Sequence, residues 1–75
     1  MRLYFNHLAK VRVHGVLHGE SFSRVYDYVV LIEEVSAKDI EKECGEKSEV
    51  CIRLQFNTGD SVAFAKETIL FYEIL

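Results

Sequence analysis

The chain has 75 residues, 49% of them hydrophobic and 12% aromatic, no proline and a net charge of −3, which together exclude a disordered chain. No apolar run approaches the 18 residues of a membrane span, and the first residues lack the continuous apolar core of a signal peptide. Two cysteines are also too few for a secreted disulfide framework. We therefore expect one folded domain, residues 1–75, in the reducing cytoplasm, without a membrane partner.

The first half of the chain predicts three strands and one loop. Residues 3–5 and residues 11–17 alternate between apolar and polar side chains, the period of a strand with one buried face. Residues 18–23 are small and polar, which indicates a loop. Residues 25–35 are nearly continuously apolar, and their middle, residues 28–32, has the pattern of a strand covered on both faces. We expect this last segment to be the central strand.

A short helix is predicted over residues 36–45. Ser36 can cap its first turn, Gly45 can end it, and the apolar residues between them recur at the i, i+3, i+7 spacing of one helix face. Two turns are unstable alone, so the helix must dock on the sheet. Cys44 at its end and Cys51 on the following strand could approach one another, and whether they form a disulfide stays open.

The second half predicts a hairpin and a last strand. Residues 50–56 alternate strictly, and Asn57-Thr58-Gly59-Asp60 follows as a turn in which glycine can take a positive φ. A second strand begins at Val62. After a tight turn at residues 65–67, the segment 68–75 carries large apolar side chains on both faces. Such a strand is an aggregation hazard unless something covers it.

These elements predict a mainly β (or α+β) fold, namely a small antiparallel, strongly bent sheet of five to six strands with one short helix. In so short a chain, closure into a small barrel with the helix at one end is the economical arrangement. The turn Gly59-Asp60-Ser61-Val62 resembles those of small SH3-like or Sm-like barrels. A likeness over four residues does not assign the chain to a family.

No residue pattern points to catalysis. The chain has no nucleophile elbow, glycine-rich phosphate loop or metal-ligand cluster. His14 and His18 would lie about 13 Å apart on a strand, too far to share an ion. Glu33 and Glu34 are adjacent on a strand, so their carboxylates point to opposite faces. We expect a non-enzymatic protein with no catalytic residue, no cofactor and no metal site.

Protein-protein contact is the predicted function, with the chain associating with itself as a homodimer or a larger assembly. Pairing along the strand 68–75 would cover its apolar side chains and enlarge a small core. The alternative, that this strand is buried within its own monomer, stays open. Aromatic residues supply many interface anchors, and the candidates are Phe22, Tyr26, Tyr28, Phe71 and Tyr72.

The alternative function is nucleic-acid binding by a small β-barrel. Small barrels often bind nucleic acid through a basic face that carries aromatic rings. Residues 10–24 supply such a face if the side chains of Lys10, Arg12, His14 and Arg24 share it. The isoelectric point of about 5.5 argues against this function, since such domains are typically basic.

Overall fold

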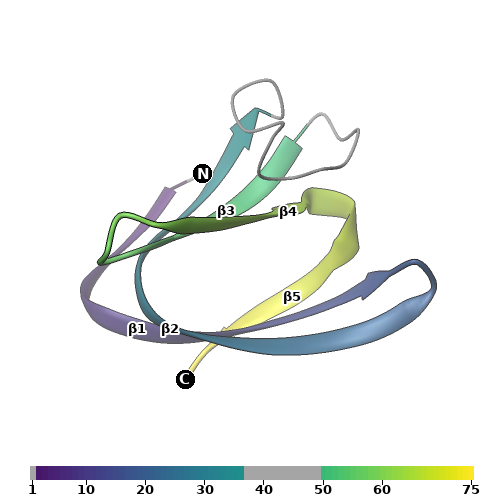
Figure 1. The fold of residues 1–75 in the computed structure, drawn as a ribbon, viewed down its shortest axis with the longest axis horizontal. Coiled ribbons are helices and arrows are strands. Elements are labelled where there is room, and N and C mark those ends of the chain that lie inside the picture. Colours follow the sequence, from purple (N-terminus) through teal and green to yellow (C-terminus); the bar gives the residue numbers. More distant parts are fainter. Residues whose placement is uncertain (1, 37–49) are drawn as a thin grey trace.

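The computed structural model describes residues 2–36 and 50–75, which form one antiparallel sheet of five strands (Figure 1). The elements are β1 (Arg2–Leu17), β2 (Glu20–Ser36), β3 (Val50–Phe56), β4 (Ser61–Ala65), the 3₁₀ helix η1 (Lys66–Thr68) and β5 (Ile69–Ile74). The strand order β4-β3-β2-β1-β5 confirms the mainly β prediction and the central place of β2. The predicted helix 36–45 lies outside the described residues, apart from Ser36, which ends β2.

The first hairpin differs from its prediction. Residues 3–5 and 11–17 belong to one 16-residue strand, β1. Where a break between them was expected, the pairing of β1 with β2 is irregular but the strand continues. The predicted loop 18–23 is mostly strand. His18 (φ 52°) and Gly19 (φ 79°) make a tight turn, and β2 begins at the next residue. Two residues of positive φ suit a two-residue hairpin turn, so no longer loop is needed.

The second hairpin confirms its prediction. β3 and β4 pair in the register Leu54↔Val62, and Gly59 takes a φ of 94° in the turn. The turn is closed by two backbone hydrogen bonds: Gly59 N donates to Phe56 O at 3.0 Å, and Phe56 N donates to Asp60 O at 2.9 Å. The tight turn expected near residue 66 is η1, and the last predicted strand is β5.

The sheet is strongly curved, but the predicted closed barrel is wrong. β1 and β2 are long strands that bend along their length, so the sheet wraps around its own interior (Figure 1). β4 and β5 are its two edges and do not pair with each other, although only the three residues of η1 separate them in the chain. Closure would require a β4–β5 ladder, and within residues 2–36 and 50–75 β5 instead pairs with β1 alone.

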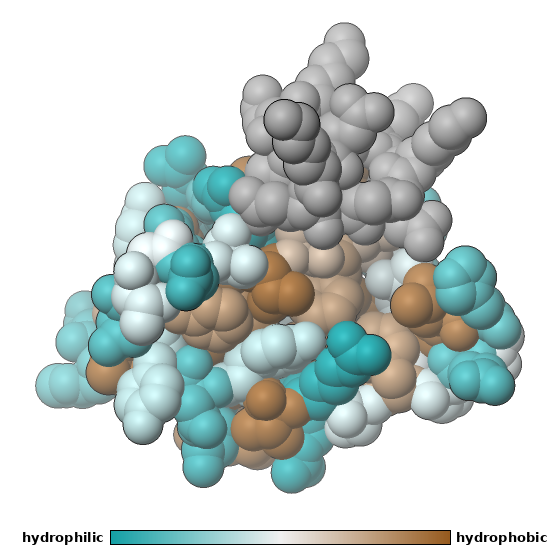
Figure 2. All heavy atoms as spheres, viewed as in Figure 1, coloured by the Kyte–Doolittle hydropathy of each residue, from teal (hydrophilic) through white to brown (hydrophobic). Residues whose placement is uncertain are grey.

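The core lies on the inner side of the curve, which we call the concave face. Its fully buried side chains come from β1, β2 and β3 and are Val11, Val13, Val29, Ile32, Ile52 and Leu54. Partly buried rings, among them those of Phe22, Tyr26 and Phe64, pack against this cluster. Figure 2 shows hydrophobic residues in the middle of one view of the molecule with hydrophilic residues around them.

The opposite face of β2 and β3 is more buried than its polar sequence predicts. Cys51 is fully buried, and Glu33 is only 2% exposed. The Glu33 carboxylate lies between two guanidinium groups, with Arg53 Nε 2.9 Å from Oε1 and Arg2 Nε 3.2 Å from Oε2. Glu34 instead pairs with Lys66 at 3.1 Å. The two adjacent carboxylates thus have separate partners, as their opposite orientations predict.

Tyr28 has a φ of 63°, which is rare for a bulky residue. It lies where the β1–β2 register shifts between the pairs Val11↔Tyr26 and Ala9↔Val29, and its carbonyl accepts a hydrogen bond of 3.0 Å from the Asn57 amide. Asparagine tolerates this backbone conformation better. We expect Tyr28→Asn to raise the free energy of unfolding, measured with urea, by about 0.5–1 kcal/mol.

Tyr4→Asn is the matched control for this substitution. Tyr4 is 64% exposed, close to the 61% of Tyr28, and its φ is not among the positive values. Because asparagine is a poor strand former, the control should be neutral or slightly destabilising. Equal losses of stability in the two variants would show that Tyr28 is not strained.

Candidate functional site

The outer edge of β5 is the first candidate surface. β5 pairs with β1 in the register Val13↔Tyr72, and its other side is an edge of the sheet. Four large apolar side chains on and just after β5 are at least half exposed, and we call them the apolar edge: Leu70 (66%), Phe71 (52%), Ile74 (50%) and Leu75 (53%). A strand edge with such side chains is a template for pairing with another chain.

β4, the other edge strand, is different. Its two large side chains, Val62 and Phe64, are partly buried and pack against the core. β4 therefore exposes mainly backbone, whereas β5 exposes backbone and large apolar groups together. This difference makes β5 the better candidate for an interface.

The aromatic residues predicted as interface anchors do not share one surface. Phe22 and Tyr26 lie on the concave face, opposite Gly15 and Val11 of β1. Tyr28 is exposed at the irregularity of β2. The remaining two are on β5 but differ in direction, since Tyr72 packs against the core and Phe71 stacks on His14 with ring centroids 4.3 Å apart.

Three of the four cations predicted to contact nucleic acid have carboxylate partners. Lys10 Nζ lies 3.6 Å from Asp27 Oδ1. Arg12 and His14 both approach Glu73, with Arg12 Nη1 at 4.0 Å and His14 Nε2 at 2.5 Å from Oε1. Lys10 and Arg12 therefore each lie near a carboxylate of the protein, and His14 shares Glu73 with Arg12.

Arg24, the fourth of these cations, lies on the other face of the sheet. It is directly opposite Val13, whose side chain is buried in the core, so Arg24 belongs to the concave face. Arg12 and His14 alternate with Val13 along β1 and point the other way. The structure does not bring the four predicted residues together into one basic face.

Arg24 also differs from the other cations in its surroundings. Within residues 2–36 and 50–75, each of the other Lys and Arg side chains has a carboxylate partner: Arg2, Lys10, Arg12, Arg53 and Lys66. Arg24 has none there, and its guanidinium carbon lies 5.5 Å from the centroid of the Phe22 ring. Such a placement is a cation–π contact.

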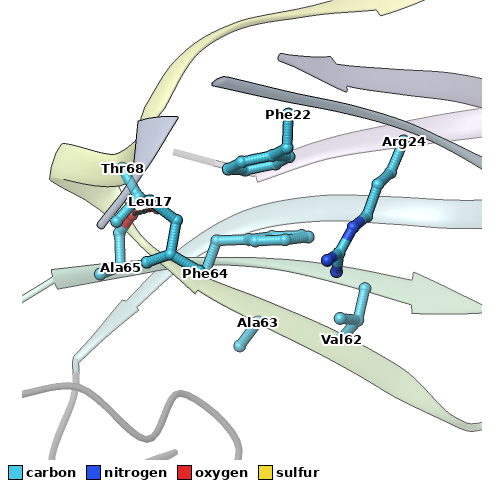
Figure 3. Close-up of a pocket in the computed structure, with 8 residues that line it drawn as sticks. All are labelled: Leu17, Phe22, Arg24, Val62, Ala63, Phe64, Ala65 and Thr68. Carbon is cyan, nitrogen blue, oxygen red and sulfur yellow. Dashed lines mark hydrogen bonds between the residues drawn. The ribbon is translucent and has the colours of Figure 1, made fainter. Parts of the chain in front are cut away.

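Arg24 borders a cavity of about 200 Å³, the second candidate site (Figure 3). The end of β1 and the first part of β2 supply one wall, β4 supplies another, and η1 closes one end. We define the Arg24 cavity by the residues Leu17, Phe22, Arg24, Val62, Phe64 and Thr68. In Figure 3 the Phe22 and Phe64 rings lie on opposite sides, and the Arg24 side chain extends toward Val62.

No protein-family model, curated protein or solved structure matches the chain. The described part of the chain contains no helix with the length and apolarity needed to cross a membrane. Among the same residues, His, Cys, Asp and Glu side chains form no group of three that could hold a metal ion. The function must therefore be inferred from the two candidate sites.

Gly15 lies close to two residues that line the Arg24 cavity, Phe22 and Thr68. A Cβ atom at this position would lie 2.3 Å from the Thr68 carbonyl oxygen and 2.6 Å from the Phe22 ring. Only glycine lets β1 approach both groups so closely. The pattern Phe22-x-Arg24 would have placed both side chains on one face, but the sequence prediction of a loop over 18–23 concealed it.

Proposed function

We propose that the chain is a non-enzymatic assembly module that acts through protein-protein contacts and associates with itself along β5. The apolar edge carries this proposal, because it combines a strand edge that has no strand neighbour among the described residues with large side chains that are at least half exposed. Covering it would remove an aggregation hazard and add buried apolar area to a small domain.

A symmetric dimer fits the order of residues along β5. Antiparallel pairing of two β5 strands about Tyr72 would place Leu70 opposite Ile74 of the partner subunit, and Phe71 opposite Glu73 of the partner subunit. No two like charges would face each other in this register, and Leu70 would meet an apolar residue, whereas Phe71 would face a charged one. The same strand serves both copies, as in the twofold interfaces that predominate among oligomers.

Leu70→Lys should weaken the association. The side chain is 66% exposed, so the monomer fold should tolerate the change, whereas a lysine on an edge strand opposes strand pairing. Because the proposed dimer is symmetric, its interface would contain the new lysine twice. We expect the dimer dissociation constant, measured by sedimentation over a concentration series, to rise at least about tenfold, equivalent to about 1.4 kcal/mol.

Leu8→Lys is the control, since Leu8 is 50% exposed and lies on β1 rather than on β5. It should leave the dissociation constant unchanged. A wild-type chain that is monomeric at every concentration would refute the proposal. So would a dimer that Leu70→Lys and Leu8→Lys affect equally.

A closer relation to small SH3-like or Sm-like domains is also a proposal. It is supported by the Gly59-Asp60-Ser61-Val62 turn into β4 and by a bent antiparallel sheet in which β1 to β4 form a meander and β5 pairs with β1. A closed barrel is not part of it, because β4 and β5 do not pair.

Nucleic-acid binding stays the second hypothesis. It is supported by the cations of residues 10–24, but the carboxylate partners of Lys10, Arg12 and His14 and the opposite direction of Arg24 make it the weaker one. Phosphate contacts are strongest at low salt. We expect no anisotropy change when a labelled mixed-sequence oligonucleotide is titrated with the protein at low salt, and a salt-dependent change would favour this hypothesis.

A further inference from the structure

We propose that the Arg24 cavity binds a carboxylate carried on an aromatic or branched apolar group about the size of one amino-acid side chain. This site is separate from the proposed self-association, because none of its residues belongs to β5. Three features support it: the nature of the walls, the volume enclosed and the unbalanced charge.

The side chains that line the cavity favour a ligand with an apolar group. The rings of Phe22 and Phe64 are nearly parallel, with centroids 6.0 Å apart and an interplanar angle of 15°. Leu17 and Val62 add aliphatic surface. The volume of about 200 Å³ is below the roughly 300 Å³ at which pockets for drug-sized ligands begin, so it suits a single side chain or a molecule of that size.

The positive charge of Arg24 favours an anionic ligand. Among the described residues, Arg24 is the one Lys or Arg without a carboxylate partner, and the other side chains that line its cavity are apolar except for Thr68. A guanidinium group holds a carboxylate through two parallel hydrogen bonds. A single cation beside an apolar cavity matches a monocarboxylate, in which one end is charged and the other is apolar.

Two sources supply this chemistry. One is the C-terminal residue of an extended peptide, whose backbone could also pair with the outer edge of β4, which has no strand neighbour among the described residues, while its side chain enters the cavity. The other is a free small acid, such as an aryl alkanoate. Both place a carboxylate on Arg24 and an apolar group in the cavity, against the side chains that line it.

The test is a titration of the full ¹⁵N-labelled chain followed by amide chemical shifts. The probes are 3-phenylpropionate and the peptide acetyl-Gly-Gly-Phe, each compared with its neutral amide. We expect the acids to shift the amides of Phe22, Phe64 and Thr68, and the neutral amides to bind at least about tenfold more weakly. Tighter binding of the peptide acid would identify a peptide source, and tighter binding of the free acid would identify a small molecule.

Variants test the role of the guanidinium. Arg24→Gln should weaken both acids at least about tenfold, and Arg24→Lys should retain part of the affinity. Lys66→Gln is the control, because it removes a surface cation that pairs with Glu34 and does not line the cavity. Circular dichroism should show all three variants folded.

Three results would overturn the proposal. The first is no shift with either acid at several millimolar. The second is equal affinity for an acid and its amide, which would mean that the cavity takes only apolar groups. The third is an Arg24→Gln variant that binds the acids as the wild type does.

Discussion

Glu33→Gln is expected to lower the free energy of unfolding by about 3 kcal/mol. The Glu33 side chain is 2% exposed and accepts hydrogen bonds from Arg53, while Arg2 pairs with its other oxygen. A neutral amide would leave both guanidinium groups without a carboxylate. The loss is at the lower end of the range for buried pairs, because Arg2 is 67% exposed and water can solvate it.

Urea unfolding monitored by circular dichroism measures this loss, and Glu34→Gln is its matched control. Glu34 is the next residue on the same strand and pairs with Lys66, but the two side chains are 31% and 55% exposed. Surface pairs of this kind contribute under about 1 kcal/mol. If the two variants lose equal unfolding free energy, the buried Glu33 cluster contributes no more to stability than the exposed Glu34 pair.

Gly15→Ala is expected to cost about 2–3 kcal/mol of unfolding free energy, toward the upper part of the range for overpacked sites. The added Cβ would lie 2.3 Å from a backbone oxygen, that of Thr68, and 2.6 Å from the Phe22 ring. A ring can rotate, but the carbonyl belongs to η1 and moves only if that turn moves. Thermal unfolding should show the loss as a decrease in Tm of more than about 8 °C.

Gly19→Asn is the control for Gly15→Ala. Gly19 has a φ of 79°, where asparagine is tolerated, and nothing lies within 4 Å of a Cβ built there. The control should change stability by less than about 1 kcal/mol. The Gly15 variant should also alter the Phe22 ring signals, and an unchanged Tm with unchanged ring signals would contradict the close packing.

The β3–β4 hairpin and the central place of β2 could be predicted from the sequence because both depend on local patterns. Strict alternation and a turn glycine at position 59 are enough for the hairpin. A nearly continuous apolar run is enough for a strand covered on both faces. The strand content of residues 18–23 was missed because Ser21 and Ser23 are polar strand residues that face water.

The candidate sites depend on how strands that are distant in the sequence are arranged in the sheet. The apolar residues of the segment 68–75 predict an interface. Only the strand order shows that β5 is an edge of the sheet. The sequence does not predict the Arg24 cavity, because its walls come from the end of β1, the first part of β2, β4 and η1.

The sequence by itself determined the alternation of the strands, the turn at Gly59 and the excess of apolar residues near the end of the chain. The tertiary structure alone decided which strands are edges and which cations are balanced. The reason is the separation along the sequence between the residues that interact. A strand's period is a property of neighbouring residues, whereas Arg53 meets Glu33 across 20 positions and His14 meets Glu73 across 59. Only the register of paired strands brings such residues together, and it leaves Arg24 beside an apolar cavity.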